Sequence, residues 1–119
     1  MWDGFDKRKF PRVKLRCEIT IQPPAPPGPI NSFTQNVGAG GVCVILDASL
    51  KRFAVCRVRL ELGKDLPTIE CDSRVVWSVP IGQAKSKKTQ YDTGLEFLGM
   101  DPEITQVLRD YLENLIPSE

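Results

Sequence analysis

The residues with the clearest chemical potential lie near the start of the chain, where six basic side chains occur within ten residues without an acidic one. They are Lys7, Arg8, Lys9, Arg12, Lys14 and Arg16. The rest of the chain, residues 17–119, contains more acidic than basic residues, although the whole chain has a formal net charge of +1. A basic segment on a mildly acidic body indicates a local site for an anion. Composition alone favours a solvated basic tail equally well.

Other chemistry is limited by residues that the chain lacks or spaces widely. The sequence contains no histidine, which excludes histidine-based catalysis and the mixed Cys/His zinc site. Its four cysteines form no CxxC pair, so we expect neither a metal site nor a redox dithiol, and we expect Cys17 and Cys43 to be small buried residues. Since no carboxylate pair or activated nucleophile stands out, the sequence predicts a protein that is not an enzyme.

The elements that must position the basic segment are mostly strands. Residues 13–21 alternate strictly between apolar and polar side chains, which predicts one half-buried strand directly after the basic segment. Further strands are predicted over residues 32–37, 42–46, 57–62, 69–79 and 91–98. A proline-rich loop at 23–29 precedes the strand 32–37, and a glycine-rich turn at 38–41 separates that strand from 42–46. Short strands with no helix between them predict an antiparallel sheet that closes into a barrel.

The hydrophobic period changes at the C-terminal end of the sequence. Asp101 is a favourable N-cap and Pro102 a favourable first residue, so we predict a closing helix over residues 101–116. Its apolar stripe consists of Ile104, Val107, Leu108, Tyr111, Leu112 and Leu115. We expect this stripe to pack on one end or face of the barrel. The alternative is pairing with a second copy, so both a monomer and a homodimer remain open.

The length of 119 residues suits one domain. We divide the chain into a flexible basic arm, residues 1–12, and a single domain, residues 13–119. The N-terminus has charged residues where a signal peptide would have an apolar core, and no apolar run approaches the length of a membrane span. We therefore expect a cytoplasmic protein with reduced thiols and without membrane insertion.

Two segments, in this order, resemble the motifs of the PilZ domain family. Residues 8–12, Arg-Lys-Phe-Pro-Arg, match its RxxxR element just before the first predicted strand. Residues 36–41, Asn-Val-Gly-Ala-Gly-Gly, are similar to its (D/N)xSxxG element. Trp77, the segment 91–97 and the closing helix also resemble later landmarks of the family. The resemblance covers nearly the whole chain.

The resemblance implies a mainly β fold, a six-stranded antiparallel PilZ-type β-barrel with a C-terminal α-helix, which binds the bacterial second messenger cyclic di-GMP. It implies that Arg8 and Arg12 clamp phosphate and guanine, that Asn36 contacts a guanine edge, and that Gly38 and Gly41 shape the pocket floor. The side-chain chemistry is suitable, because guanidinium groups form forked hydrogen bonds with phosphate oxygens or with the O6/N7 edge of guanine. No cofactor other than this ligand is expected.

One position departs from the family pattern, because Gly38 stands where the second element has a serine. The missing hydroxyl removes one hydrogen bond, worth about 0.5–1.5 kcal/mol. We expect a cyclic di-GMP receptor that signals in trans, through a ligand-dependent interaction with an unidentified effector protein. The alternative is a degenerate PilZ-like adaptor that binds protein and no nucleotide. Binding of single-stranded nucleic acid is not expected, because few aromatic residues are available as stacking platforms.

Overall fold

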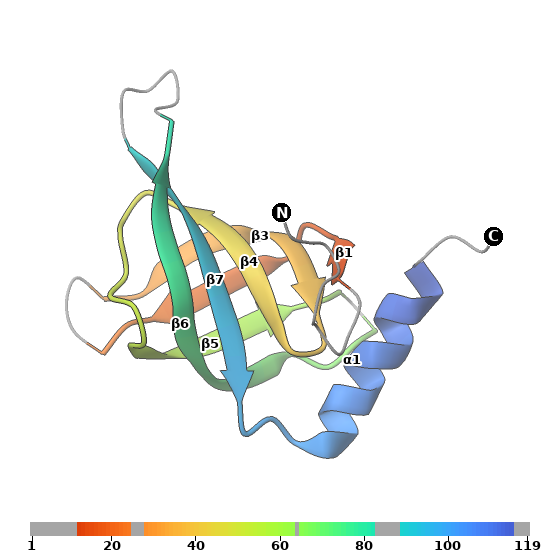
Figure 1. Ribbon diagram of the computed structural model, residues 1–119. Helices are drawn as coiled ribbons and strands as arrows, with labels where there is room; N and C mark the ends of the chain where they lie inside the picture. Colours follow the sequence, from red (N-terminus) through yellow and green to blue (C-terminus); the bar gives the residue numbers. More distant parts are fainter. Residues whose placement is uncertain (1–11, 25–27, 64, 83–88, 116–119) are drawn as a thin grey trace.

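A closed antiparallel barrel with one helix makes up the computed structural model, which describes residues 12–24, 28–63, 65–82 and 89–115 (Figure 1). Its elements are β1 (Arg12–Lys14), β2 (Glu18–Gln22), β3 (Ile30–Gly38), β4 (Gly41–Leu46), β5 (Val55–Glu61), β6 (Ile69–Ile81), β7 (Gln90–Leu98) and α1 (Pro102–Leu115). The sheet order is β1-β3-β2-β5-β6-β7-β4, and β3 also pairs with β4. This last pairing closes six strands into a barrel and leaves β1 as an extra strand beside β3. The predicted six-stranded antiparallel barrel with a C-terminal helix is confirmed.

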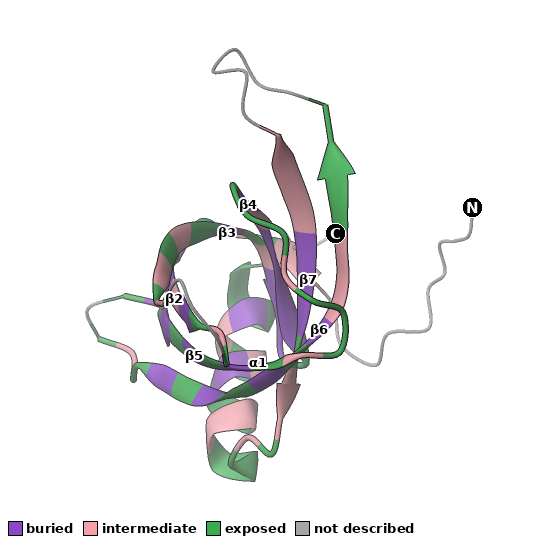
Figure 2. Ribbon diagram, turned by 90° about the vertical axis from the view of Figure 1, so that its left-hand side faces the viewer, coloured by how far each residue is buried: buried purple, intermediate pink, exposed green. Residues whose placement is uncertain are grey.

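Alternation of apolar and polar residues builds the inner face of the barrel. In β5 every second residue is buried, while Arg57 and Arg59 between them are exposed. The same alternation along residues 13–21 faces Cys17, Ile19 and Ile21 into the core, as predicted. Figure 2 shows buried and exposed bands alternating along these strands. The fully buried side chains are mostly β-branched residues and leucines, which suits a half-buried strand surface.

The prediction of one uninterrupted strand over residues 13–21 is wrong at its centre, because the structure divides this segment into β1 and β2. The two strands pair with β3 in registers that differ by one residue, so the ladder is interrupted between them. The hydroxyl of Thr34 replaces the missing ladder bonds. Its Oγ1 accepts a hydrogen bond from the amide of Cys17 at 2.9 Å and donates one to the carbonyl oxygen of Leu15 at 2.6 Å. Thr34 and Cys17 are buried, so these bonds satisfy the hydroxyl of Thr34 and the amide of Cys17 where water has little access.

Helix α1 begins and ends within one residue of the predicted limits. Asp101 is its N-cap, and the Oδ1 atom of Asp101 accepts a hydrogen bond from the amide of Glu103 at 2.8 Å.

In the part of the chain that the structure describes, no helix combines the length and apolar character needed to cross a membrane.

The helix packs across the barrel end that carries β1, as Figure 1 shows. Leu108 and Leu112 are buried and join the hydrophobic core. The predicted stripe is wrong for Val107 and Leu115, which are exposed. The physical reason is that α1 contacts only β1 and β3 closely, so that the line through Leu108 and Leu112 is buried and the flanks of the helix are not.

The β4–β5 connection presents a phenylalanine in a backbone conformation that favours glycine. Phe53 has a φ of 72°, in the left-handed region. The amide of Phe53 donates a hydrogen bond to the carbonyl oxygen of Val75 at 2.7 Å. The amide of Val75 donates one to the carbonyl oxygen of Ala54 at 2.9 Å. Phe53 and Ala54 thus lie opposite the single residue Val75. This is the arrangement of a G1 β-bulge, whose first position is normally a glycine. These bonds fix the backbone, although Phe53 itself is 61% exposed.

Replacement of Phe53 by glycine should therefore stabilise the fold. The left-handed conformation costs a residue with a Cβ atom about 1–2 kcal/mol, and glycine removes this cost. The greater conformational freedom of glycine in the unfolded chain offsets roughly 0.5–1 kcal/mol of the resulting stabilisation. We expect Phe53→Gly to raise the denaturation midpoint measured by circular dichroism. Phe53→Ala is the matched control, because it removes the ring and keeps the Cβ atom. A midpoint for Phe53→Gly no higher than that of Phe53→Ala would show that the turn is not strained.

Candidate functional site

Four of the five residues predicted for the ligand site lie together on the outer face of the barrel. Arg12 of β1 pairs with Gly38 of β3, and Gly38 pairs in turn with Gly41 of β4. Asn36 lies two residues before Gly38 in β3 and so projects from the same face. Arg8, the fifth residue, lies outside the described residues.

A side-chain hydrogen bond joins the two polar members of this group. Nη1 of Arg12 donates to Oδ1 of Asn36 at 3.2 Å. Arg12, which the sequence predicts to belong to the flexible arm, is the first residue of β1. Its pairing with Gly38 and its bond to Asn36 hold the guanidinium group over β3. Residues 1–11, the rest of the predicted arm, lie outside the described part of the chain.

The other two described residues of the basic segment are Lys14, the last residue of β1, and Arg16, which lies in the break between β1 and β2. Lys14 pairs with Asn36 and so extends the basic row beside Arg12. Arg16 lies elsewhere, with its guanidinium carbon 4.0 Å from the ring centroid of Phe33. Arg16 and Phe33 line a surface groove of about 490 Å³ with Glu61 and five other residues. The described part of the basic segment is thus divided between two parts of the surface.

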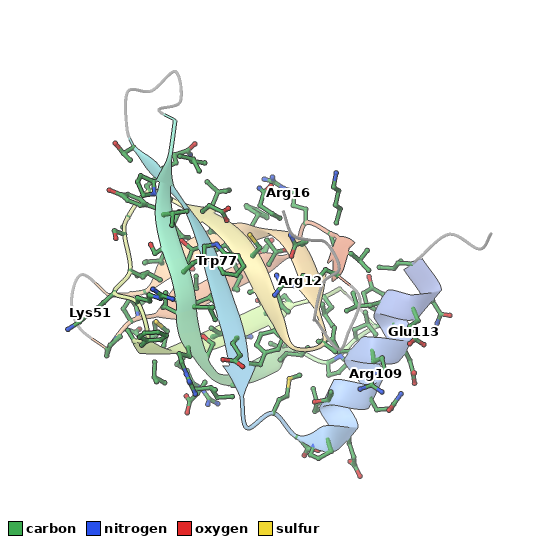
Figure 3. All side chains as sticks on the ribbon, viewed as in Figure 1. Arg12, Arg16, Lys51, Trp77, Arg109 and Glu113 are labelled. Atoms are coloured by element: carbon green, nitrogen blue, oxygen red, sulfur yellow. The ribbon has the colours of Figure 1, made fainter. Side chains whose placement is uncertain are left out.

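Trp77, which is not among the residues predicted for the site, lies at the other end of the same outer face. Asn36 pairs with Cys43 of β4, Cys43 pairs with Gly94 of β7, and Gly94 pairs with Trp77 of β6. The indole lies flat over Gly94, because a Cβ atom there would be 2.6 Å from three ring atoms. Figure 3 shows Arg12 and Trp77 on the same side of the barrel. A glycine inside a predicted strand is the sequence signal for such a close approach.

Asp92 holds this end of the face in place. Its Oδ1 atom accepts hydrogen bonds from Nε1 of Trp77 at 3.3 Å and from Sγ of Cys43 at 3.0 Å. Burial, reinforced by the Asp92 carboxylate, raises the pKa of the Cys43 thiol to about 12, while the charge of Arg12 acts in the opposite direction. The thiol is therefore protonated at neutral pH and is not a nucleophile. The predictions that Cys17 and Cys43 are buried are confirmed.

The two glycines of the predicted site differ in their structural roles. A Cβ atom at Gly41 would overlap the carbonyl oxygen of Leu95 on β7, so the close approach of β4 and β7 requires glycine there. Gly38 is not among the described glycines with a positive φ. A serine at position 38, as in the family motif, would therefore meet no backbone strain of the left-handed kind.

The Gly41→Ala substitution should destabilise the barrel, whatever Gly41 does for a ligand. The added methyl group must displace the β7 backbone, and such overpacking typically costs about 1–3 kcal/mol. Thermal denaturation compared with Gly82→Ala gives the measurement, because a Cβ atom at Gly82 has no neighbour within 4 Å. Equal midpoints for the two variants would show that β4 and β7 tolerate a side chain between them.

A scan of protein-family models finds the PilZ domain over residues 6–114, a range that reaches from the basic segment into α1. A comparison with curated protein sequences finds no match.

The fold is also similar to solved structures. The Bacillus subtilis inhibitor of motility (MotI/DgrA) aligns with a TM-score of 0.74 at 23% identity, over 93% of this chain and 52% of that one. The PilZ domain of YcgR from Escherichia coli, solved with c-di-GMP, aligns at 0.70 and 12% identity over 92% of both chains. The K. pneumonia MrkH–c-di-GMP complex aligns at 0.71 and 17% identity, over 92% of this chain and 52% of that one. The chain thus spans about half the length of MotI and MrkH, and at these identities the likeness shows the fold.

Proposed function

The chain belongs to the PilZ domain family, and we propose that it is a cyclic di-GMP receptor that signals in trans through an effector protein. The observation that carries the proposal is the hydrogen-bonded pair of Arg12 and Asn36 on a face floored by glycines. Within this proposal the protein is not an enzyme, acts in the cytoplasm as a monomer or homodimer, and binds neither nucleic acid nor membrane.

The arginines supply the contacts to the anionic part of the ligand. Arg12 already projects over β3, and its planar guanidinium suits two oxygens of one phosphate or the O6/N7 edge of guanine. Arg8 precedes it by four residues, and Pro11 restricts Phe10 to an extended backbone, so the intervening segment suits an arm that reaches over the ligand. The amide of Asn36 contributes both a donor and an acceptor for a guanine edge.

The floor of the face suits a flat ligand. Gly38, Gly41 and Cys43 have small side chains or none, so a purine can approach the sheet closely there, whereas the indole of Trp77 covers Gly94. Trp77 bounds this floor, and its hydrogen bond to Asp92 fixes the plane of the indole. We assign Trp77 to the site as a surface against which a guanine stacks.

A second candidate function, a protein-binding adaptor without nucleotide, is favoured by one specific observation. Gly38 replaces the hydroxyl residue of the family motif, and the site has lost the hydrogen bond which that hydroxyl makes. Both candidate functions use the same barrel, and both act by binding an effector protein. They differ only in whether the Arg12 face is occupied by cyclic di-GMP.

The Arg12→Ala substitution should weaken cyclic di-GMP binding by about 1.5–3 kcal/mol, because a charged and forked hydrogen bond is lost. Isothermal titration calorimetry measures the effect, with GTP as the ligand control. Arg59→Ala is the matched variant, since Arg59 lies on the outer face of β5 and pairs with Glu61 and Glu70. It should bind as the wild type does. An unchanged affinity in the double variant Arg8→Ala, Arg12→Ala would end the receptor proposal.

The Gly38→Ser substitution separates the two candidate functions. In a receptor that merely lacks one hydroxyl, serine should tighten binding by about 1 kcal/mol, close to fivefold. The thermal midpoint should be measured beside the affinity, so that a folding defect is recognised. If the wild type and a stable Gly38→Ser variant both fail to bind at millimolar ligand, the adaptor is the correct function.

A further inference from the structure

The most exposed large apolar side chain of the described residues lies in the β4–β5 turn, on a rigid backbone. Phe53 is 61% exposed, and Val55, two residues later, is 47% exposed. Arg74 of β6 is directly opposite Val55 in the β5–β6 ladder. With Lys51 and Arg52 these residues form what we call the docking patch. Figure 3 places Lys51 on the opposite side of the molecule from α1.

The fold gains little from a phenylalanine at this position. The left-handed φ of 72° favours glycine, and more than half of the ring faces solvent. The backbone hydrogen bonds from Phe53 to Val75 and from Val75 to Ala54 nevertheless hold Phe53 in a single place on the surface. Strain that persists at an exposed, fixed side chain is typical of residues kept for an interaction.

The charged residues of the docking patch itself are all cations. The guanidinium carbon of Arg52 lies 4.8 Å from the centroid of the Phe53 ring. The neighbouring arginines of β5, Arg57 and Arg59, form ion pairs with acidic residues of β5 and β6. Among the described residues, by contrast, no acidic side chain forms an ion pair with the three cations of the docking patch. They are Lys51, Arg52 and Arg74.

We propose that the docking patch binds the effector protein, through an apolar pocket on that protein rimmed by carboxylates. An aromatic anchor flanked by arginine is the composition of residues that dominate protein interfaces. The carboxylates of the partner would neutralise these three cations, which form no ion pair within the described residues, while its pocket would cover the ring of Phe53. This inference rests on one part of the proposed function, namely that the chain acts by binding an effector protein.

A protein fits the borders of the patch better than an anionic membrane does. Glu96 of β7 is opposite Arg74, and Asp72 lies two residues before Arg74 on the same face of β6. Lipid headgroups of uniform negative charge would be repelled by these carboxylates. A folded protein can place charges of either sign where they are needed.

The docking patch also borders the candidate nucleotide site. Arg74 and Trp77 project from the same outer face of β6, opposite Glu96 and Gly94 of β7. A ligand stacked on Trp77 would therefore lie beside a protein bound at Arg74. This contiguity would make the affinity of the partner depend on the nucleotide, without a change of the fold.

The test uses a library of random displayed peptides, selected on the wild-type protein and counter-selected on Phe53→Gly. We expect enriched peptides in which aspartate or glutamate surrounds an apolar residue. Fluorescence anisotropy of an enriched peptide should show binding to Phe53→Gly weakened by about tenfold or more, as expected for the loss of an interface anchor. Val107→Ala, which removes an exposed apolar side chain of α1, is the matched control and should bind as the wild type does.

Three results would overturn the proposal: no enriched peptide, enriched peptides without acidic residues, or equal binding to Phe53→Gly. Vesicles of phosphatidylcholine and phosphatidylglycerol form a second arm. Their binding to the wild type and not to Phe53→Gly would assign the patch to membranes instead. Calorimetry with cyclic di-GMP keeps the two proposals apart, since Phe53→Gly should retain nucleotide binding. Peptide binding by a wild type that binds no nucleotide would refute the receptor function and leave the docking patch in place.

Discussion

Strand β3 pairs with three other strands, and the barrel and the candidate site both depend on this arrangement. Its first half pairs with β2 and its second half with β1, while β4 on the other edge closes the barrel. The buried hydroxyl of Thr34 bridges the junction between β1 and β2. Because Asn36 and Gly38 follow directly in β3, the same junction brings Arg12 beside them. The geometry of the site is therefore a consequence of how the barrel accommodates one additional residue.

Much of the fold is predictable from local patterns. Strict alternation in residues 13–21 and 57–62 identifies the inward faces, and the change to a helical period identifies α1 and its cap at Asp101. The break between β1 and β2 is not predictable in this way, because the alternation of inward side chains continues through it. The signal lies in Thr34, a residue 17 positions from Cys17, whose hydroxyl replaces the ladder bonds.

The candidate site is predictable where motifs name its residues and not where distant strands supply them. The two motifs point to Arg12, Asn36, Gly38 and Gly41, which the structure brings to one face. Trp77 and Asp92 come from β6 and β7, and only the pairing of these strands shows that they belong beside Asn36. The strained turn at Phe53 is not predictable from the sequence. Phe53 has a left-handed backbone conformation, and the residue that normally indicates this conformation is glycine.

The central claim is that the outer face of β1, β3 and β4, bounded by Trp77, binds cyclic di-GMP. The most direct measurement is a two-dimensional ¹H–¹⁵N NMR titration of the whole chain with this nucleotide. The account predicts saturable shifts of the Arg12, Asn36 and Gly38 amides and of the Trp77 indole N–H. Shifts confined to residues elsewhere, such as the groove beside Phe33, or no shifts at millimolar nucleotide, would contradict it.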